Sequence, residues 1–295
     1  MSASAPSQLR PVGAVLTSIL SLQFGAAFAT TLFSDIGAAG ATTLRLTIAA
    51  VILGIVVRPR WSTWSQRQRQ GIAALGIALA VMNAAFYLAL DTLPIGTAVT
   101  IEFLGPLTLA AVLSRRWADG AWVALALGGV VLLGFGDHGD GGLDPAGVMF
   151  ALVAAVAWAG YIVAGSHLAS TLPSADGLAG AGIIAAVLTL PFGVVAGGSA
   201  LLDPKILLAG LAVALLSSVI PYSLEMWALR SLAKKVFAVL IALEPAAAAL
   251  AGVLIIGQSL DPVTLVAIGL VVSAGIGTVI MNRNPGATDQ KRGGP

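Results

Sequence analysis

Residues 89–106, ALDTLPIGTAVTIEFLGP, match residues 228–245, ALRSLAKKVFAVLIALEP, at a constant offset of 139. Both stretches open on Ala-Leu, carry leucine at their fifth position and close on a proline, Pro106 in one and Pro245 in the other. An ordered set of matches over this length predicts an internal repeat. The fold is therefore expected to consist of two related halves.

A second match supports this division of the chain. Glycines and valines in residues 128–136 recur in residues 269–277 at an offset of 141. We assign the first half to residues 12–136 and the second to residues 146–282. The polar tail that follows, residues 283–295, is expected to be disordered and cytoplasmic.

The composition requires a membrane environment. Charged residues make up only 9% of the 295 residues and hydrophobic residues 58%, whereas a soluble domain carries about 25% charged residues. A helix of about 20 residues crosses the hydrocarbon core of a bilayer. Ten stretches approach or exceed that length, the fifth being the shortest: residues 12–33, 38–57, 71–90, 94–114, 120–136, 146–169, 177–198, 206–228, 236–257 and 262–282. The sequence thus predicts an all-α integral membrane protein with ten transmembrane helices.

The distribution of Lys and Arg predicts the orientation. With the amino terminus in the cytoplasm, 13 of the 15 basic residues fall in cytoplasmic segments, and only Lys205 falls in an outer loop. Both termini are therefore expected to be cytoplasmic. Because each half has five spans, an odd number, the second half would be inverted relative to the first. Inverted repeats are typical of secondary transporters, which bind solute near the midplane.

Two ionisable residues share a depth in the first half. At 1.5 Å per residue, Arg45 and Glu102 both lie roughly 10–12 Å below the outer edge of their spans. Ionisable side chains at this depth are costly and usually functional. They could form a structural ion pair, or Arg45 could bind a substrate carboxylate with Glu102 as its resting partner.

Two further glutamates lie in the second half. Glu244 precedes Pro245 and matches the depth of no basic residue, so a neutral, protonatable carboxyl group is expected there. We predict a proton-coupling or ammonium-binding role for Glu244, with a hydrogen-bonded structural acid as the alternative. Glu225 lies near the end of its span, where it could reach water; it and Glu102 are the other candidates for proton coupling.

Neutral polar residues and prolines complete the predicted site. Gln23, Asn83, Tyr161 and Tyr222 are candidate substrate ligands, whereas Tyr87 fits the interfacial aromatic belt. Pro106 and Pro245 each remove a backbone donor, so they are expected to kink their helices.

Several classes of chemistry are disfavoured. The chain contains no cysteine, and its two histidines do not gather with acids inside a span, so neither a metal site nor a cofactor is expected. The basic residues are scattered beside the spans rather than clustered, which argues against nucleic acid as a partner. The expected partners are a small-molecule substrate, protons and membrane lipid. The oligomeric state is left open.

Five short sequence motifs in this chain resemble those of a known protein family. The chain resembles the EamA-type transporters of the drug/metabolite transporter superfamily, most closely the branch of bacterial threonine and homoserine exporters. The motifs are ATTLRL at 41–46, MNAAFYL at 82–88, EFLGPL at 102–107, PYSLEM at 221–226 and EPA at 244–246.

The resemblance implies an inner-membrane carrier that exports small neutral amino acids, coupled to the proton gradient. One departure is Gln258, which follows Gly257 where family members commonly have glutamate. No proton role is carried over to that position. Export of another small metabolite or a drug is the alternative function. An intramembrane enzyme is a remote one, since Glu102 and Glu244 lie in opposite halves with no histidine near either. A scaffold is equally remote, since it would not explain charges kept inside the spans.

Overall fold

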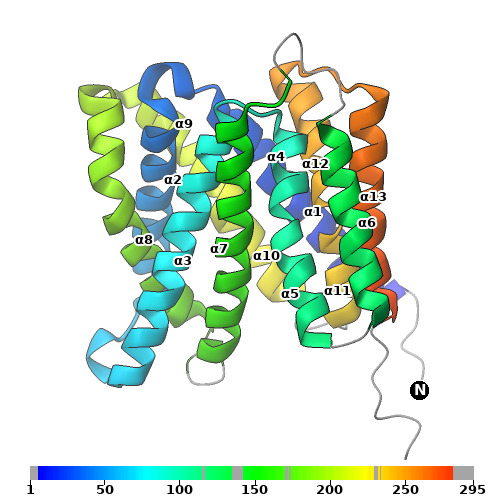
Figure 1. The fold of residues 1–295 in the computed structure, drawn as a ribbon. Helices are drawn as coiled ribbons and strands as arrows, with labels where there is room; N and C mark the ends of the chain where they lie inside the picture. Colours follow the sequence, from blue (N-terminus) through cyan, green and yellow to red (C-terminus); the bar gives the residue numbers. More distant parts are fainter. Residues whose placement is uncertain are drawn as a thin grey trace, which may run out of the picture.

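The protein is a helical bundle whose helices run roughly parallel to one axis (Figure 1). The computed structural model describes residues 6–114, 117–134, 142–169, 172, 174–228, 232 and 234–281, apart from the side chains of 6–8, 114, 117–119, 169, 174, 222, 226, 234, 235 and 281. Every regular element in these ranges is helical. The expected tail at 283–295 lies outside the described residues.

The longer helices match the predicted spans closely. The elements are α1 (Pro6–Thr30), α2 (Phe33–Val57), η1 (Trp61–Thr63), α3 (Gln66–Leu90), α4 (Ile95–Glu102), α5 (Leu104–Ser114), α6 (Trp117–Leu133), α7 (Pro145–Ala169), α8 (Ser174–Gly197), η2 (Gly198–Leu202), α9 (Pro204–Ala214), η3 (Leu215–Val219), α10 (Ile220–Ala228), α11 (Lys234–Ile241), α12 (Glu244–Ala251), η4 (Gly252–Ile256) and α13 (Pro262–Met281). Among the described residues, nine helical stretches are long and apolar enough to cross a membrane. The expected fifth span corresponds to α6, whose apolar part, Gly120–Leu133, is shorter.

The surface of the bundle is apolar in the way that contact with lipid requires. Large hydrophobic side chains such as Val195, Val156 and Phe192 are at least 70% exposed. In water these side chains would cost free energy in proportion to their area, whereas lipid tails accommodate them. The interior, by contrast, contains many alanines and glycines, which let helix backbones approach closely.

Two of the spans are broken near their middle. The fourth span divides between α4 and α5, and the ninth divides between α11 and α12. In each case the first segment ends four residues before a proline: Glu102 before Pro106, and Ile241 before Pro245. Proline has no N–H to donate to the carbonyl group four residues earlier, so the helical ladder is interrupted there. The two breaks are separated by the same 139 residues as the sequence repeat.

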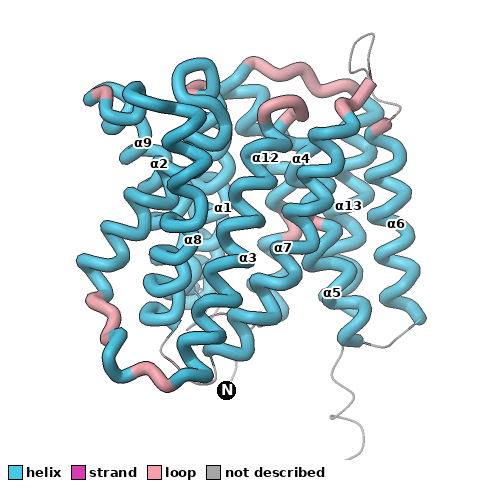
Figure 2. Tube along the Cα trace, turned by 60° about the vertical axis from the view of Figure 1, so that its left-hand side comes forward, coloured by secondary structure: helices cyan, strands magenta, loops and turns pink. Residues whose placement is uncertain are grey.

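Segments from the two halves of the chain lie side by side throughout the bundle. The α2 helix packs against α8, α3 against α7, α4 against α12 and α6 against α13 (Figures 1 and 2). The start of α1 and the end of α13 lie at the same end of the molecule as the connection between α2 and α3 (Figure 1). We call this the lower end; the connections that precede α4 and α13 lie at the upper end.

Candidate functional site

A central cavity collects almost all of the residues that the sequence analysis singled out. Its volume is about 310 Å³, at the lower limit of typical ligand pockets. It is lined by residues from both halves: Leu22, Gln23, Ala26, Arg45, Met82, Asn83, Phe86, Val99, Glu102, Pro106, Trp158, Tyr161, Ile162, Pro221, Glu225, Phe237, Ile241 and Glu244. Of the predicted site residues, Pro245 is not in the lining, and the side chain of Tyr222 lies outside the described residues.

Arg45 is buried and held by an irregular part of the eighth span. Pro221 cannot donate a hydrogen bond to the carbonyl group of Ser217, four residues earlier. The segment around Ser217, η3, is a π-helical turn. Arg45 Nη2 donates to the Ser217 carbonyl oxygen, which cannot receive a hydrogen bond from Pro221, at 3.1 Å, and Arg45 Nε donates to Ser218 Oγ at 3.3 Å. The guanidinium group is therefore positioned by the backbone of the opposite half.

Tyr87 contributes to the same arrangement, which corrects its expected place in the interfacial belt. Its side chain is fully buried. Its hydroxyl oxygen accepts a hydrogen bond from Arg45 Nη1 at 3.4 Å, and its ring centroid lies 5.5 Å from the guanidinium carbon. Counting residues along the span predicts how deep Tyr87 lies in the membrane, but not toward which neighbours its side chain points. In the structure the side chain points into the bundle, toward Arg45.

Glu102 and Glu244 both occupy helix breaks. Glu102 is the last residue of α4, and Glu244 is the first residue of α12. Their side chains are only 8% and 5% exposed. A carboxylate in the first turn of a helix is stabilised by the unpaired backbone N–H groups and the dipole there, which applies to Glu244. Arg45 lies within electrostatic range of Glu102.

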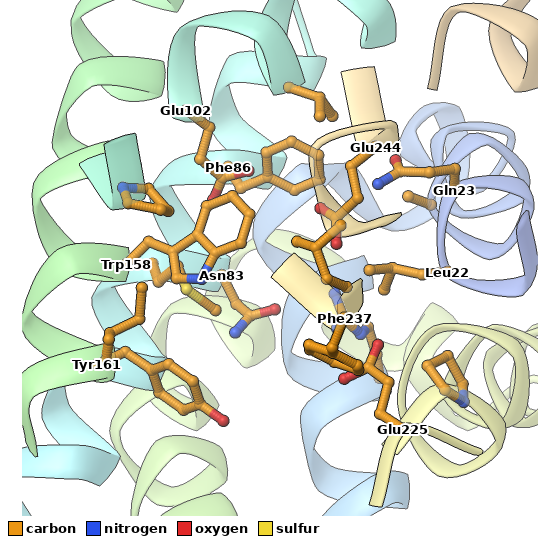
Figure 3. Close-up of a pocket in the computed structure, with 18 residues that line it drawn as sticks. Leu22, Gln23, Asn83, Phe86, Glu102, Trp158, Tyr161, Glu225, Phe237 and Glu244 are labelled. Carbon is orange, nitrogen blue, oxygen red and sulfur yellow. The ribbon is translucent and has the colours of Figure 1, made fainter. Parts of the chain in front are cut away.

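Glu225 is partly buried and lines the cavity. Its Oε1 atom accepts a 2.6 Å hydrogen bond from Ser18 Oγ, on α1. The cavity thus contains three carboxyl groups, and both Glu225 and Glu102 lie within electrostatic range of Glu244. Figure 3 shows the three glutamates around one space, with Glu102 above and Glu225 below.

The neutral polar residues differ in how well they are satisfied. Asn83 Nδ2 donates to the Leu79 carbonyl oxygen at 2.8 Å. Gln23 is 3% exposed, and its Oε1 atom has no hydrogen-bond partner within the described part of the chain. An unpaired buried carbonyl oxygen costs free energy, so Gln23 is the neutral side chain best prepared to accept a hydrogen bond from a ligand. Tyr161 lines the lower part of the cavity (Figure 3).

Aromatic side chains form a further part of the wall that the sequence analysis missed. The rings of Trp158 and Phe103 pack edge to face with centroids 6.0 Å apart. Phe237, on α11, lies across the cavity from Trp158 (Figure 3). A tryptophan in the middle of an apolar span, away from either interface, is the signal that could have identified Trp158. Similarly, Pro221 inside a span could have indicated the irregular turn around Ser217.

The described residues hold no cluster of three or more His, Cys, Asp or Glu side chains suited to a metal ion. The polar groups in the lining of the cavity include one guanidinium, three carboxyls, two amides and a phenol. Together they can bind a small molecule that carries both charges, and they can exchange protons.

Known proteins resemble this chain over nearly its whole length. A model described as the EamA-like transporter family matches residues 145–281. The threonine/homoserine exporter RhtA of Escherichia coli (strain K12) is 37% identical over 274 residues, which covers 92% of each chain. The protein of the same name from Salmonella typhimurium (strain LT2) is 38% identical over 277 residues, 93% of each chain.

One solved crystal structure adds evidence on the fold. It covers 95% of this chain with a TM-score of 0.61 at 22% sequence identity, and 99% of its own length is matched. A likeness at this identity concerns the fold alone, and it extends across both halves. With the family model on the second half and relatives that align across both, the chain belongs to the EamA-like transporter family.

Proposed function

We propose that this protein exports small neutral amino acids such as threonine and homoserine across the bacterial inner membrane. The observation that carries the proposal is the central cavity, in which one guanidinium group and three carboxyl groups from both halves surround the same space. A neutral amino acid is a zwitterion, so it needs one cationic and one anionic partner. The named activity of the two relatives supports the same substrate class.

The substrate carboxylate binds Arg45 in this proposal. The guanidinium group is already oriented by Ser217, Ser218 and Tyr87, so little conformational entropy is lost when a ligand binds. The ammonium group binds among Glu102, Glu225 and Glu244. The side-chain hydroxyl group of the substrate reaches Gln23, Asn83 or Tyr161.

Proton coupling follows from the imbalance of charge. Three ionised carboxylates with one guanidinium group would leave uncompensated negative charge in a buried space, which is costly. An arriving ammonium group supplies positive charge and favours the ionised carboxyls. Its departure favours protonation. Substrate and proton thus compete for the same groups, as an antiporter requires, and we assign the coupling proton first to Glu244.

The arrangement of helices supports ten spans in two inverted halves. With α6 counted as the fifth span, the second span packs against the seventh, the fourth against the ninth and the fifth against the tenth. The third also packs against the sixth, and the first against the eighth. A pseudo-two-fold axis would exchange each of the first five spans with the span five places later. Under this exchange, the pairs 2–7, 4–9 and 5–10 are unchanged, and the pair 3–6 becomes the pair 8–1. Pro106 and Pro245 then mark equivalent hinges, and alternating access moves one half against the other.

Efflux from proteoliposomes tests the proposal. Purified protein is reconstituted, and the efflux of radiolabelled amino acids is measured with and without a pH gradient. We expect threonine and homoserine to be transported, and uphill transport to require the gradient. Transport of other metabolites but not of amino acids would contradict the substrate class. Equal uphill transport in both conditions would contradict proton coupling.

A further inference from the structure

A second cavity lies at the upper end of the bundle, where α4 and α13 begin. Its volume is about 420 Å³. Its lining comes from Thr92 and Pro94 before α4, from the start of α4, from residues 142 and 143, and from residues 257–261 and 264. The polar side chains in this lining include those of Thr97, Gln258 and Asp261. We call it the outer pocket.

Thr97 is the first indication that the outer pocket binds something. Its side chain is fully buried, and its Oγ1 atom has no partner in the described part of the chain. A buried hydroxyl group without a hydrogen bond costs free energy. Thr100, one turn further along the same helix and equally buried, donates its hydroxyl group to the Gly96 carbonyl oxygen at 2.6 Å. The helix itself therefore provides a way to satisfy such a group, and Thr97 does not use it.

The start of α4 is the second indication. The first intrahelical hydrogen bond of this helix runs from the Ala98 N–H to the Pro94 carbonyl oxygen, at 3.0 Å. The N–H groups of the residues before Ala98 have no acceptor within the helix. Gln258 Oε1 accepts one of them, from Ile95, at 3.3 Å. Those of Gly96 and Thr97 lie next to the unpartnered hydroxyl group, and such a helix start favours an anionic group.

Asp261 provides the opposite charge. It is the residue before α13, and its carboxylate accepts hydrogen bonds from the Val263 and Thr264 N–H groups and from the Thr264 hydroxyl group. The hydrogen bond from the Thr264 side chain is the main factor that lowers the pKa of Asp261. The carboxylate is therefore ionised at neutral pH, and it lines the same pocket as Thr97.

We infer that the outer pocket is a second binding site for the exported zwitterion, occupied after the solute has left the central cavity. The solute carboxylate binds the start of α4 and the Thr97 hydroxyl group, and its ammonium group lies toward Asp261. This inference rests on the proposed function, since it takes its ligand from there.

The wall between the two cavities is thin. Thr97 lines the outer pocket and Val99 lines the central cavity, a separation of about 3 Å along the axis of α4. At this level α4 packs closely on α12: a Cβ added to Gly96 would lie 2.9 Å from the Ala249 Cβ. A small displacement of α4 from α12 would join the two cavities. The position of the outer pocket is thus that of an exit site.

Equilibrium binding of radiolabelled L-threonine and L-homoserine to the purified full-length protein tests the inference. We expect two molecules bound per chain at saturation. Thr97→Val removes the hydroxyl group but preserves shape, so it should raise the dissociation constant of one of the two sites roughly 3- to 10-fold and leave the other unchanged. Thr100→Val is the matched control and should leave both dissociation constants unchanged.

The possible outcomes separate this inference from the proposed function. Arg45→Lys should remove the other site and leave the one that depends on Thr97. A single molecule per wild-type chain, lost in Arg45→Lys and retained in Thr97→Val, would overturn the outer site and leave the proposed function intact. Two sites with unchanged dissociation constants in Thr97→Val would also overturn the outer site. No binding of either amino acid would overturn both proposals.

Labelling of a cysteine tests the location independently, because the native chain contains none. Ser259 is exposed and lines the outer pocket. In intact cells, external L-threonine should slow the reaction of Ser259→Cys with an impermeant maleimide at least threefold, and the protection should be lost when Thr97→Val is added. Lys205→Cys, which lies outside the pocket, is the control and should react at the same rate with or without threonine. Absence of protection at Ser259→Cys would contradict the location.

Discussion

Arg45 donates a 3.1 Å hydrogen bond to the carbonyl oxygen of Ser217, a group to which Pro221, four residues later, has no N–H to donate. A charged side chain of the second span is thereby attached to the backbone of the eighth. A main-chain carbonyl group does not titrate, so this acceptor is unchanged when carboxyl groups gain or lose protons. The guanidinium group can thus remain oriented while Glu102, Glu225 and Glu244 exchange protons or bind substrate.

Arg45→Lys should reduce transport about 10- to 100-fold while the protein still inserts. Lysine keeps the charge but loses the planar fork that contacts Ser217, Ser218 and a substrate carboxylate together, and charged hydrogen bonds contribute about 1.5–3 kcal/mol. Initial efflux rates in proteoliposomes measure the effect. A wild-type rate would rule out the geometric role of the guanidinium group.

The double variant of Arg45→Lys and Glu102→Gln distinguishes a structural ion pair between Arg45 and Glu102 from separate functions of the two residues. If Arg45 and Glu102 act as a pair, the double variant should lose little more than either single variant. If Arg45 binds the carboxylate and Glu102 the ammonium group or the proton, the losses should multiply. The same efflux assay, with expression levels matched, gives both results.

Pro221→Ala should also impair transport, although it removes only a ring. Alanine restores an N–H that can bond to the Ser217 carbonyl oxygen, which competes with Arg45 for this acceptor and straightens the eighth span. We expect a loss of roughly threefold or more. Pro191→Ala is the control, because Pro191 lies inside α8 on an exposed face. Equal, unchanged rates in both variants would contradict the link between Pro221 and Arg45.

Gly105→Ala should destabilise the bundle. A Cβ at this position would lie 1.9 Å from the Ala155 carbonyl oxygen, so α5 would have to move away from α7. Overpacking of this kind costs about 1–3 kcal/mol. The melting temperature in detergent should fall. Gly182→Ala, in α8 with no atom within 4 Å of the added Cβ, should leave it unchanged or raise it. Equal melting temperatures would contradict the close approach.

The sequence predicted how deep a residue lies in the membrane better than it predicted the direction in which its side chain points. Counting residues placed Arg45 and Glu102 at one level, and they line the same cavity. The same counting put Tyr87 at an interface, whereas it is buried beside Arg45. Depth depends on the rise per residue, which is fixed. The direction of a side chain around its helix depends on which neighbours pack against it, and a single sequence does not contain that information.

Helix irregularities explain the rest of what was missed. The prolines predicted breaks in the helices. The fourth and ninth spans are indeed interrupted four residues before Pro106 and Pro245. The π-helical turn at Leu215–Val219 was not predicted, because its cause combines Pro221 with acceptors that only the folded bundle provides. The hydrogen bond from Ser18 to Glu225 likewise joins residues 207 positions apart. Such contacts require the tertiary structure.

The cytoplasmic orientation of the termini can be tested with single cysteines. The positive-inside rule puts Lys205 outside and Gln66 inside. Both side chains are exposed. They belong to the first turns of α9 and α3, two helices that start at opposite ends of the bundle (Figure 1). In intact cells, Lys205→Cys should react with an impermeant maleimide, and Gln66→Cys should react only after permeabilisation. The reverse pattern would overturn the orientation.

Glu244→Gln should uncouple transport from the proton gradient. Glutamine preserves the shape and much of the hydrogen bonding at the start of α12, but it cannot bind or release a proton. Glu244 is buried, begins the segment after a helix break, and is near two other acids. Movement at that break can change which side of the membrane supplies its proton.

The decisive comparison for Glu244→Gln is between uphill efflux and exchange. Exchange of labelled for unlabelled threonine at equal concentrations needs substrate binding and movement but no net proton transfer, so it should survive in the variant. Accumulation against a gradient, driven by a pH difference, should be lost. Glu102→Gln and Glu225→Gln serve as parallel variants. If Glu244→Gln accumulates threonine as the wild type does, with the same pH dependence, the coupling proton resides on another acid. Whichever parallel variant keeps exchange but loses accumulation then identifies that acid.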